Sequence, residues 1–242
     1  MTTTTYDLYL ESGPRYRTTM VHVLDPELLG CVAVGPTTAA ALAATPEAIR
    51  AFGRFLHRHG ELVDTNEPFQ TQVAEHITEG EMLGSGSPYL LFGPDLAPLS
   101  ETEIDSFLRR SRALRGELAD WTATQTDELL DALPDKGRSK RAVLLHVLGA
   151  TGPSLSGALG TAPGFHAARS AAERGELSLA DALRRTATMA TERVLAATPE
   201  ERMRIRELPG GRRTLRQALR HLLEHDWEHM AELSRRPNGP LL

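Results

Sequence analysis

Three histidines stand four residues apart near the end of the chain: His221, His225 and His229. On an α-helix a step of four residues turns about 400°, so each side chain would lie only about 40° round from the last. The three imidazoles would therefore line one face of a helix. Imidazole is the most common protein ligand for divalent transition metals. Two such ligands one turn apart need only a third group from elsewhere to complete an open metal site.

The strongest candidate for the third group is His146, which is flanked by apolar residues within Val143–Leu148. We expect this segment to face the core, where a histidine must satisfy both ring nitrogens. Metal ligation through one nitrogen, with a hydrogen bond from the other, would do so. The alternative is a core histidine that is satisfied by hydrogen bonds alone.

The position of His221 suggests a different role from that of a ligand. It is separated from His229 by about 12 Å along a straight helix, which is too far for one ion to bind both with ease. We therefore expect His221 behind the ligands, in the wall of a pocket or on the surface. A set of three histidines accepts zinc, nickel or iron, and the ligands alone do not choose among them.

Four carboxylates accompany these histidines on the same predicted helix. Glu224 or Glu232 could orient a ligand by accepting a hydrogen bond from its second ring nitrogen. Asp226 and Glu228 are expected on other faces of the helix, which makes them poor candidates for a general base. The alternative is a histidine cluster without metal, in which Glu224 and Glu228 pair with nearby arginines.

Helices are the elements that would position these side chains, because apolar residues follow a helical period from Leu99 onward. Ser100–Glu103 is a capping-box sequence that opens the first of them. Four main helices favour a bundle. They are predicted from Ser100 to about Trp121, from Ser139 to Ala150 with a kinked continuation beyond Gly152 and Pro153, from Ser178 to about Ala197, and from the N-cap Thr214 onward.

The first third of the chain has the pattern of a small sheet. Three segments alternate or are rich in β-formers, and we expect strands of an antiparallel sheet at Tyr6–Leu10, Tyr16–Leu24 and Leu29–Val34. Phe69–Ile77 is a further candidate strand. Between them the sequence predicts a helix that ends near Gly60.

Two helix start signals precede Gly60. Thr37 and Thr38 can serve as an N-cap pair before an Ala-rich stretch, and a second signal follows at Thr45 and Pro46. The predicted fold class is therefore α+β. Residues 1–80 would form a small α/β domain, residues 81–98 a connector rich in Gly, Ser and Pro, and residues 99–242 a four-helix bundle with the metal site.

The composition limits the classes of function. The net charge of −5 over 242 residues gives no reason to expect nucleic-acid binding. Cys31 is the only cysteine, so no internal disulfide can form, which fits a reducing compartment. The N-terminus lacks the features of a signal peptide, and we see no apolar run of the roughly 20 residues that span a bilayer. We therefore expect a cytoplasmic protein without a membrane partner.

The ligand pattern resembles that of the DinB-like superfamily, which are four-helix bundles with a metal site at one end. In that family a histidine on the second helix joins a pair four residues apart on the last helix. The resemblance implies ligand roles for His146, His225 and His229. Arg213–Arg216 is also similar to the family's lead-in to the last helix. The resemblance covers about residues 98–236, and it departs after the pair, where His229–Glu232 replaces a string such as His-Arg-Gly-Gln.

The DinB-like resemblance implies chemistry as well as fold. Members include thiol transferases and thiol-dependent isomerases that use mycothiol or bacillithiol, and others look like hydrolases. The Ala- and Arg-rich composition resembles that of actinobacterial proteins, for which mycothiol would be the co-substrate. We therefore predict a divalent-metal-dependent enzyme that acts on a small molecule, as a thiol transferase or isomerase, with a metal-dependent hydrolase or lyase as the alternative.

A second resemblance lies at the N-terminus. Gly30–Thr38, after two alternating strands and before an Ala-rich helix, looks like the N-terminal domains of HicB-like antitoxins, over about residues 5–60. This resemblance implies a small α/β unit with a three-stranded sheet, which would cover the bundle or mediate formation of a homodimer. It also leaves open a non-catalytic binding or regulatory module, in which the HicB-like unit recognises a partner.

Overall fold

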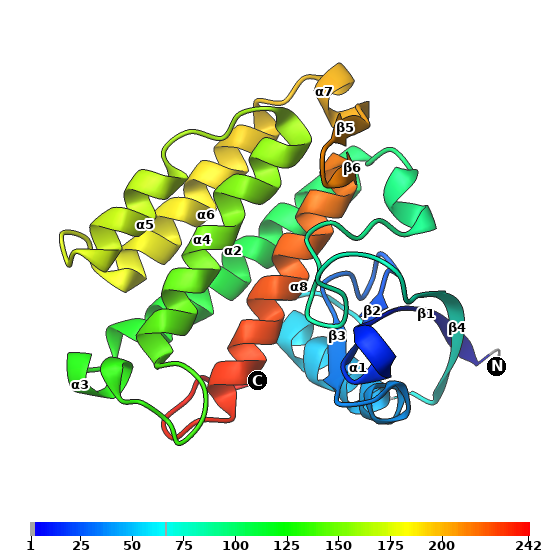
Figure 1. Ribbon diagram of the computed structural model, residues 1–242, viewed down its shortest axis with the longest axis horizontal. Coiled ribbons are helices and arrows are strands. Elements are labelled where there is room, and N and C mark those ends of the chain that lie inside the picture. Colours follow the sequence, from blue (N-terminus) through cyan, green and yellow to red (C-terminus); the bar gives the residue numbers. More distant parts are fainter. Residues whose placement is uncertain (1–2, 66) are drawn as a thin grey trace.

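The computed structural model describes residues 3–65 and 67–242, and it shows a small α/β unit beside a larger group of helices (Figure 1). The α/β unit contains a four-stranded sheet with the order β3-β2-β1-β4. The strands are β1 (Thr4–Ser12), β2 (Thr19–Val23), β3 (Val32–Gly35) and β4 (Phe69–Ile77). The three predicted strands pair antiparallel, and the candidate strand at Phe69–Ile77 is confirmed.

Strand β4 departs from an antiparallel sheet, because it pairs parallel to β1. Helix α1 (Thr38–Arg58) lies between β3 and β4 in the chain. A helical crossover of this kind is what joins parallel strands. The second predicted strand starts later than expected, at Thr19, because Pro14–Tyr16 forms a short turn with positive φ at Arg15 and Tyr16.

Helix α1 begins at the first of its two predicted start signals. The Thr37 side chain accepts a hydrogen bond from the backbone N–H of Ala40 and caps the helix. Pro46 therefore lies inside α1, where it cannot donate a backbone hydrogen bond. The buried face of α1 packs on the sheet, and Phe52 and Phe55 also contact the ring of Trp227, with centroids 5.0 Å and 5.4 Å away.

The helical part is built around four long helices, as the sequence predicts: α2 (Glu101–Ala123), α4 (Lys140–Leu159), α6 (Leu179–Leu195) and α8 (Leu215–Ser234). Helix α2 packs against α6 and α8, and α4 packs against α6 and α8. Ser or Thr side chains cap the N-termini of all four helices. Helix α4 continues through Pro153 to Leu159.

Short elements connect the long helices. They are the turn η2 (Gly93–Leu96), the helices α3 (Asp127–Asp131), α5 (Phe165–Glu173) and α7 (Pro199–Met203), and the hairpin of β5 (Arg206–Leu208) and β6 (Gly211–Arg213). The sequence analysis did not predict α5, which packs against α4 and α6. Its N-cap residue is Gly164, which offers no capping side chain.

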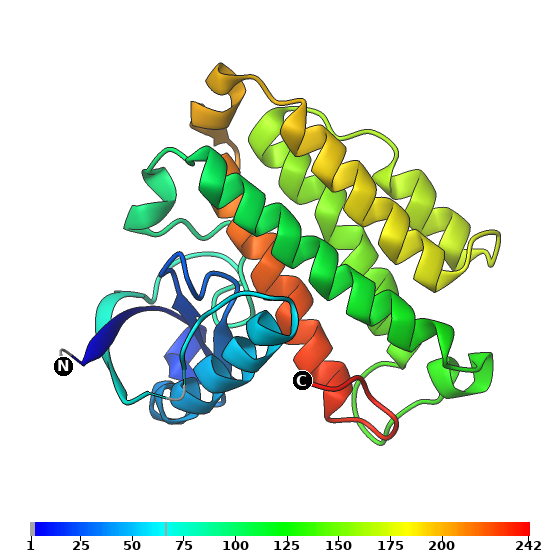
Figure 2. The ribbon, with the colours of Figure 1, turned by 180° about the vertical axis from the view of Figure 1, so that it is seen from behind.

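Helix α8 lies between the two parts of the molecule. It packs against α2 and α4 on one side and against β3 on the other. Figure 2 shows from behind that the α/β unit and the other long helices lie on opposite sides of α8. Most of its side chains are buried, including charged ones such as Arg220, Glu224 and Asp226.

Helix α4 alone, within the described residues, is long and apolar enough to cross a membrane, with a mean hydropathy of 1.4. This differs from the sequence analysis, which found no such run. Half of that window is buried inside the protein. The apolar residues Val143, Leu144, Val147 and Leu148 are all buried, as in the core helix of a bundle.

Candidate metal centre

His146 on α4 and His225 and His229 on α8 come together at one point. One ring nitrogen from each lies within 4.8 Å of the others, and the Nε2 atoms of His146 and His225 are 3.0 Å apart. Ligands about 2.1 Å from a tetrahedral ion lie about 3.4 Å from one another. The three donors therefore fit around one divalent ion after small rotations of their side chains.

The packing of α4 against α8 explains the convergence. His225 and His229 are one helical turn apart and are almost buried, at 9% and 6% exposure. His146 is exposed, contrary to the expectation that it lies in the core. The apolar residues around it turn toward the bundle, and His146 lies on the opposite side, at the cavity. A core histidine satisfied by hydrogen bonds alone is therefore the wrong description of His146.

The second nitrogens of the α8 pair face carboxylates. His229 Nδ1 lies 2.9 Å from Glu232 Oε2, and Arg138 Nη2 lies 3.2 Å from the same oxygen. His225 Nδ1 lies 3.8 Å from Asp226 Oδ1, and Arg115 Nη2 donates to that oxygen at 2.9 Å. The contact with Glu232 leaves Nε2 of His229 free to bind a metal and sets the orientation of that ring. His225 Nδ1 makes no hydrogen bond to a described residue and only lies near the Asp226 carboxylate.

The imidazoles of His146 and His225 are held in the neutral form that a metal requires. Burial, with the neighbouring rings of His225 and His229, lowers the pKa of His146 to about 4. Burial also lowers the pKa of His225. The hydrogen bond with His229, opposed by partial burial and aided by Arg138, lowers the pKa of Glu232 to about 2. At neutral pH His146 and His225 therefore offer imidazole lone pairs, and Glu232 is ionised.

A cavity of about 780 Å³ opens onto the three histidines. Its walls come from α4, α5, α8 and the connector that precedes η2. Met82, Gly86 and Pro88 line it from the connector, and Leu145 and Pro153 line it from α4. The size is within the range of small-molecule sites in proteins.

Two further α8 side chains line this cavity. His221 lies there, with its ring centroid 5.7 Å from that of His225, and burial lowers its pKa to about 3. Glu228 also lines the cavity, although the sequence analysis put it on another face of the helix. Burial raises the pKa of Glu228, and no hydrogen bond or ion pair joins its side chain to another described residue. Glu228 is seven residues from His221 and three from His225, so it shares their face of the helix. It is a base candidate that the sequence analysis missed.

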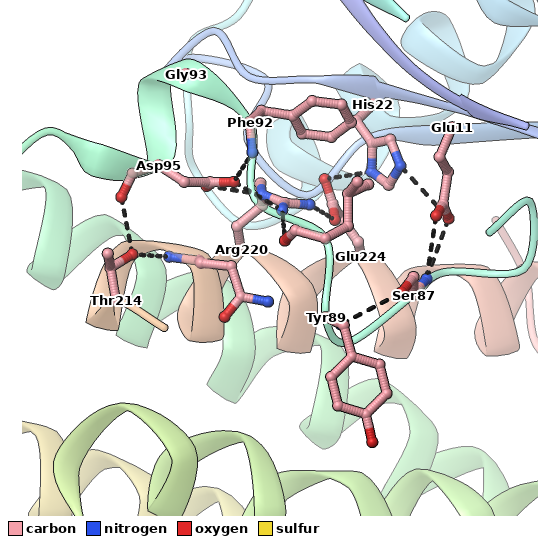
Figure 3. A network of polar contacts seen from close by, with 12 residues as sticks. Glu11, His22, Ser87, Tyr89, Phe92, Gly93, Asp95, Thr214, Arg220 and Glu224 are labelled. Atoms are coloured by element: carbon pink, nitrogen blue, oxygen red, sulfur yellow. Dashed lines mark hydrogen bonds and ion pairs between the residues drawn. The ribbon is translucent and has the colours of Figure 1, made fainter. Parts of the chain in front are cut away.

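Glu224 does not orient a ligand, contrary to expectation. Its carboxylate faces the sheet, 3.0 Å from His22 Nδ1 and 2.6 Å from Arg220 Nη1 (Figure 3). The Arg220 guanidinium also donates to both carboxylate oxygens of Asp95, at 2.8 Å and 2.9 Å. Glu11 completes this buried polar network, 3.8 Å from His22 Nε2. Every member of the network is at most 2% exposed.

Comparison with known proteins yields one solved structure and no family. No protein-family profile and no curated protein matches the sequence. The structure is similar to YfiT from Bacillus subtilis, described as a probable metal-dependent hydrolase with an unusual four-helix bundle topology. The match covers 57% of this chain and 89% of that chain, at 20% sequence identity and a TM-score of 0.44.

Proposed function

We propose that this chain is a divalent-metal-dependent enzyme that acts on a small molecule, with His146, His225 and His229 as ligands. The convergence of three imidazoles at the edge of a cavity carries the proposal. Three protein ligands leave positions open to water or substrate. A divalent ion bound there would supply a Lewis acid, which lowers the pKa of a bound water or thiol.

Other residues around the site would orient the ligands, accept a proton and exclude water. Glu232, held by Arg138, fixes the ring of His229, and Asp226, held by Arg115, lies behind His225. Glu228 would accept the proton from the nucleophile, because its carboxylate is unpaired in the same cavity and burial raises its pKa toward neutrality. Apolar lining residues such as Leu145 and Pro153 would exclude water from the bound substrate.

Thiol transfer or isomerisation with a mycothiol-type co-substrate is the specific reaction that we propose. The sequence resemblance to thiol-dependent DinB-like enzymes supports it, together with a cavity large enough for an organic thiol. Hydrolysis is the second candidate, because the unpaired Glu228 carboxylate also suits activation of water. Mycothiol with chlorodinitrobenzene, and a nitrophenyl ester without thiol, distinguish these reactions when each is tested against His146→Ala.

Metal content tests the proposal directly. We expect about one ion per chain in tag-free protein by elemental mass spectrometry, and its loss from folded His146→Ala and His225→Ala proteins. His57→Ala, which changes an exposed histidine of α1 outside the cavity, should keep the metal. No uptake by the wild type after incubation with zinc, nickel and iron, or undiminished uptake by His146→Ala, would contradict the proposal.

A further inference from the structure

His221 is a buried polar side chain that faces the cavity without a polar partner. It is 7% exposed, and no hydrogen bond or ion pair joins its ring to another residue in the described part of the chain. Its ring centroid lies 5.7 Å from that of His225. A buried imidazole without hydrogen bonds is destabilising. Water or a ligand group inside the cavity must therefore satisfy it.

The wall beside His221 is held from two directions. Glu11 on β1 accepts hydrogen bonds from the backbone N–H groups of Gly86, at 2.7 Å, and Ser87, at 3.1 Å. Gln217 on α8 donates to the backbone carbonyl of Pro88 at 2.9 Å. Both Gly86 and Pro88 line the cavity. The connector is thus fixed by the sheet and by α8, so this end of the cavity has a defined shape.

The charges in the cavity argue against an anion at this end. Arg138 is paired with Glu232, and Arg169 lies 3.8 Å from Glu173. The unpaired charge among the described lining residues is the Glu228 carboxylate, which would repel an anion. A neutral imidazole offers one donor and one acceptor, the combination that a hydroxyl or an amide group can use.

We propose that His221, with the wall at Gly86 and Pro88, forms a subsite that binds an uncharged hydroxyl or amide group of the substrate beside the candidate metal centre. The subsite rests on the proposed function, because the metal would hold the reacting end of the same molecule. It assigns the N-terminal unit a part in substrate selection, since Glu11 of that unit positions the wall.

The experiment uses the full chain loaded with Co²⁺, whose absorption reports ligands that bind the ion. Mercaptoalcohols of increasing chain length are compared with alkanethiols of equal length. We expect the hydroxyl to tighten binding about 2- to 10-fold at one chain length, the effect of one hydrogen bond. The gain should vanish in His221→Phe and persist in part in His221→Gln. Azide, too small to reach His221, should bind all three proteins equally.

Failure of the subsite and failure of the metal site would give different results. An equal gain in wild type and His221→Phe, or no gain at any length while azide still binds, would overturn the subsite and leave the metal site intact. Tighter binding of mercaptoalkylamines, lost in Glu228→Gln, would also overturn it, because the cavity would then select a cation. Failure of the wild-type protein to bind Co²⁺ would overturn the proposed function itself.

Discussion

Helix α8 carries histidines, carboxylates and arginines on two faces, and the faces differ in how these groups are satisfied. On the sheet face, Arg220 and Glu224 join the buried polar network with His22, and the charged groups meet opposite charges. On the cavity face, His225 and His229 point ring nitrogens toward one another and toward open space. Charged groups that are paired within the protein hold a structure together, whereas polar groups that face a cavity without a partner are candidates for function.

The pKa values of His22, in the network on the sheet face, and of His221, at the cavity, differ in the same way. Burial alone would lower the pKa of His22, but the carboxylate of Glu224 and the contact with Glu11 raise it to about 9. Burial and the neighbouring ring of His225 lower the pKa of His221 to about 3, and the charge of Glu224 opposes this only in part. One histidine is therefore a cation within an ion network, and the other is a neutral donor and acceptor.

The largest expected effect comes from a substitution that disrupts the buried polar network on the sheet face of α8. Arg220→Met would leave the buried carboxylates of Asp95 and Glu224 without their main cation. We expect a loss of about 3–5 kcal/mol in the free energy of unfolding, measured by urea denaturation. Arg212→Met, at an exposed arginine of β6, is the control and should change stability by less than about 0.5 kcal/mol. A loss below about 1 kcal/mol for Arg220→Met would contradict this account of the network.

The next largest expected effect is a fall in stability as the pH rises. The folded pKa of His22 lies above its ordinary value of 6.5, so the folded protein binds the proton more tightly than the unfolded chain. This contribution is complete below about pH 6.5 and is lost as the pH rises through about 9. It amounts to about 3 kcal/mol, at about 1.4 kcal/mol per pKa unit. Urea denaturation of metal-free protein across this window should show the fall, and His22→Gln should reduce it.

A smaller effect, on metal affinity, is expected from a change at Glu232, which contacts a candidate ligand. Glu232→Gln keeps the size of the side chain but weakens the contact with His229 Nδ1. We expect metal affinity to fall about 10- to 100-fold, as measured by competition with a chelator. Glu173→Gln, at the far rim of the cavity, is the control and should retain wild-type affinity. Equal affinity in wild type and Glu232→Gln would mean that Glu232 does not orient the ring.

The smallest expected effect is on the stability of the metal-free protein when His146, on the cavity side, is replaced. His146 is exposed, and its one hydrogen bond to a described residue is to His225, so His146→Ala should change the stability of the metal-free protein by less than about 0.5 kcal/mol. Metal should stabilise the wild type and leave the variant unchanged. Thermal unfolding with and without metal measures both quantities. A large destabilisation without metal would indicate that His146 is a structural residue.

The sequence predicted the parts of the site that depend on one helix. The four-residue spacing places His225 and His229 on one face, and the Ser and Thr caps predict where the long helices begin. His146 was identified correctly as the residue that α4 brings to this pair, but on the incorrect premise that it is buried. Apolar neighbours of a helical residue do not say which way that residue itself points.

The parts that depend on contacts between elements could not be predicted. Glu224 faces away from the ligands because the sheet packs on the far side of α8, where His22 lies. Similarly, β4 pairs parallel to β1 because α1 crosses the sheet before it. None of these contacts is encoded in the spacing of one segment.

The position of α8 has a consequence for synthesis on the ribosome. This helix is translated after every long helix and strand that it packs against. Until it emerges, Phe52 and Phe55 lack the ring of Trp227 and the bundle lacks its central member. A nascent chain that stalls before Leu215 would therefore expose apolar surface on both units, and such surface is what chaperones bind and what drives aggregation. Folding of the two units is coupled to completion of the chain.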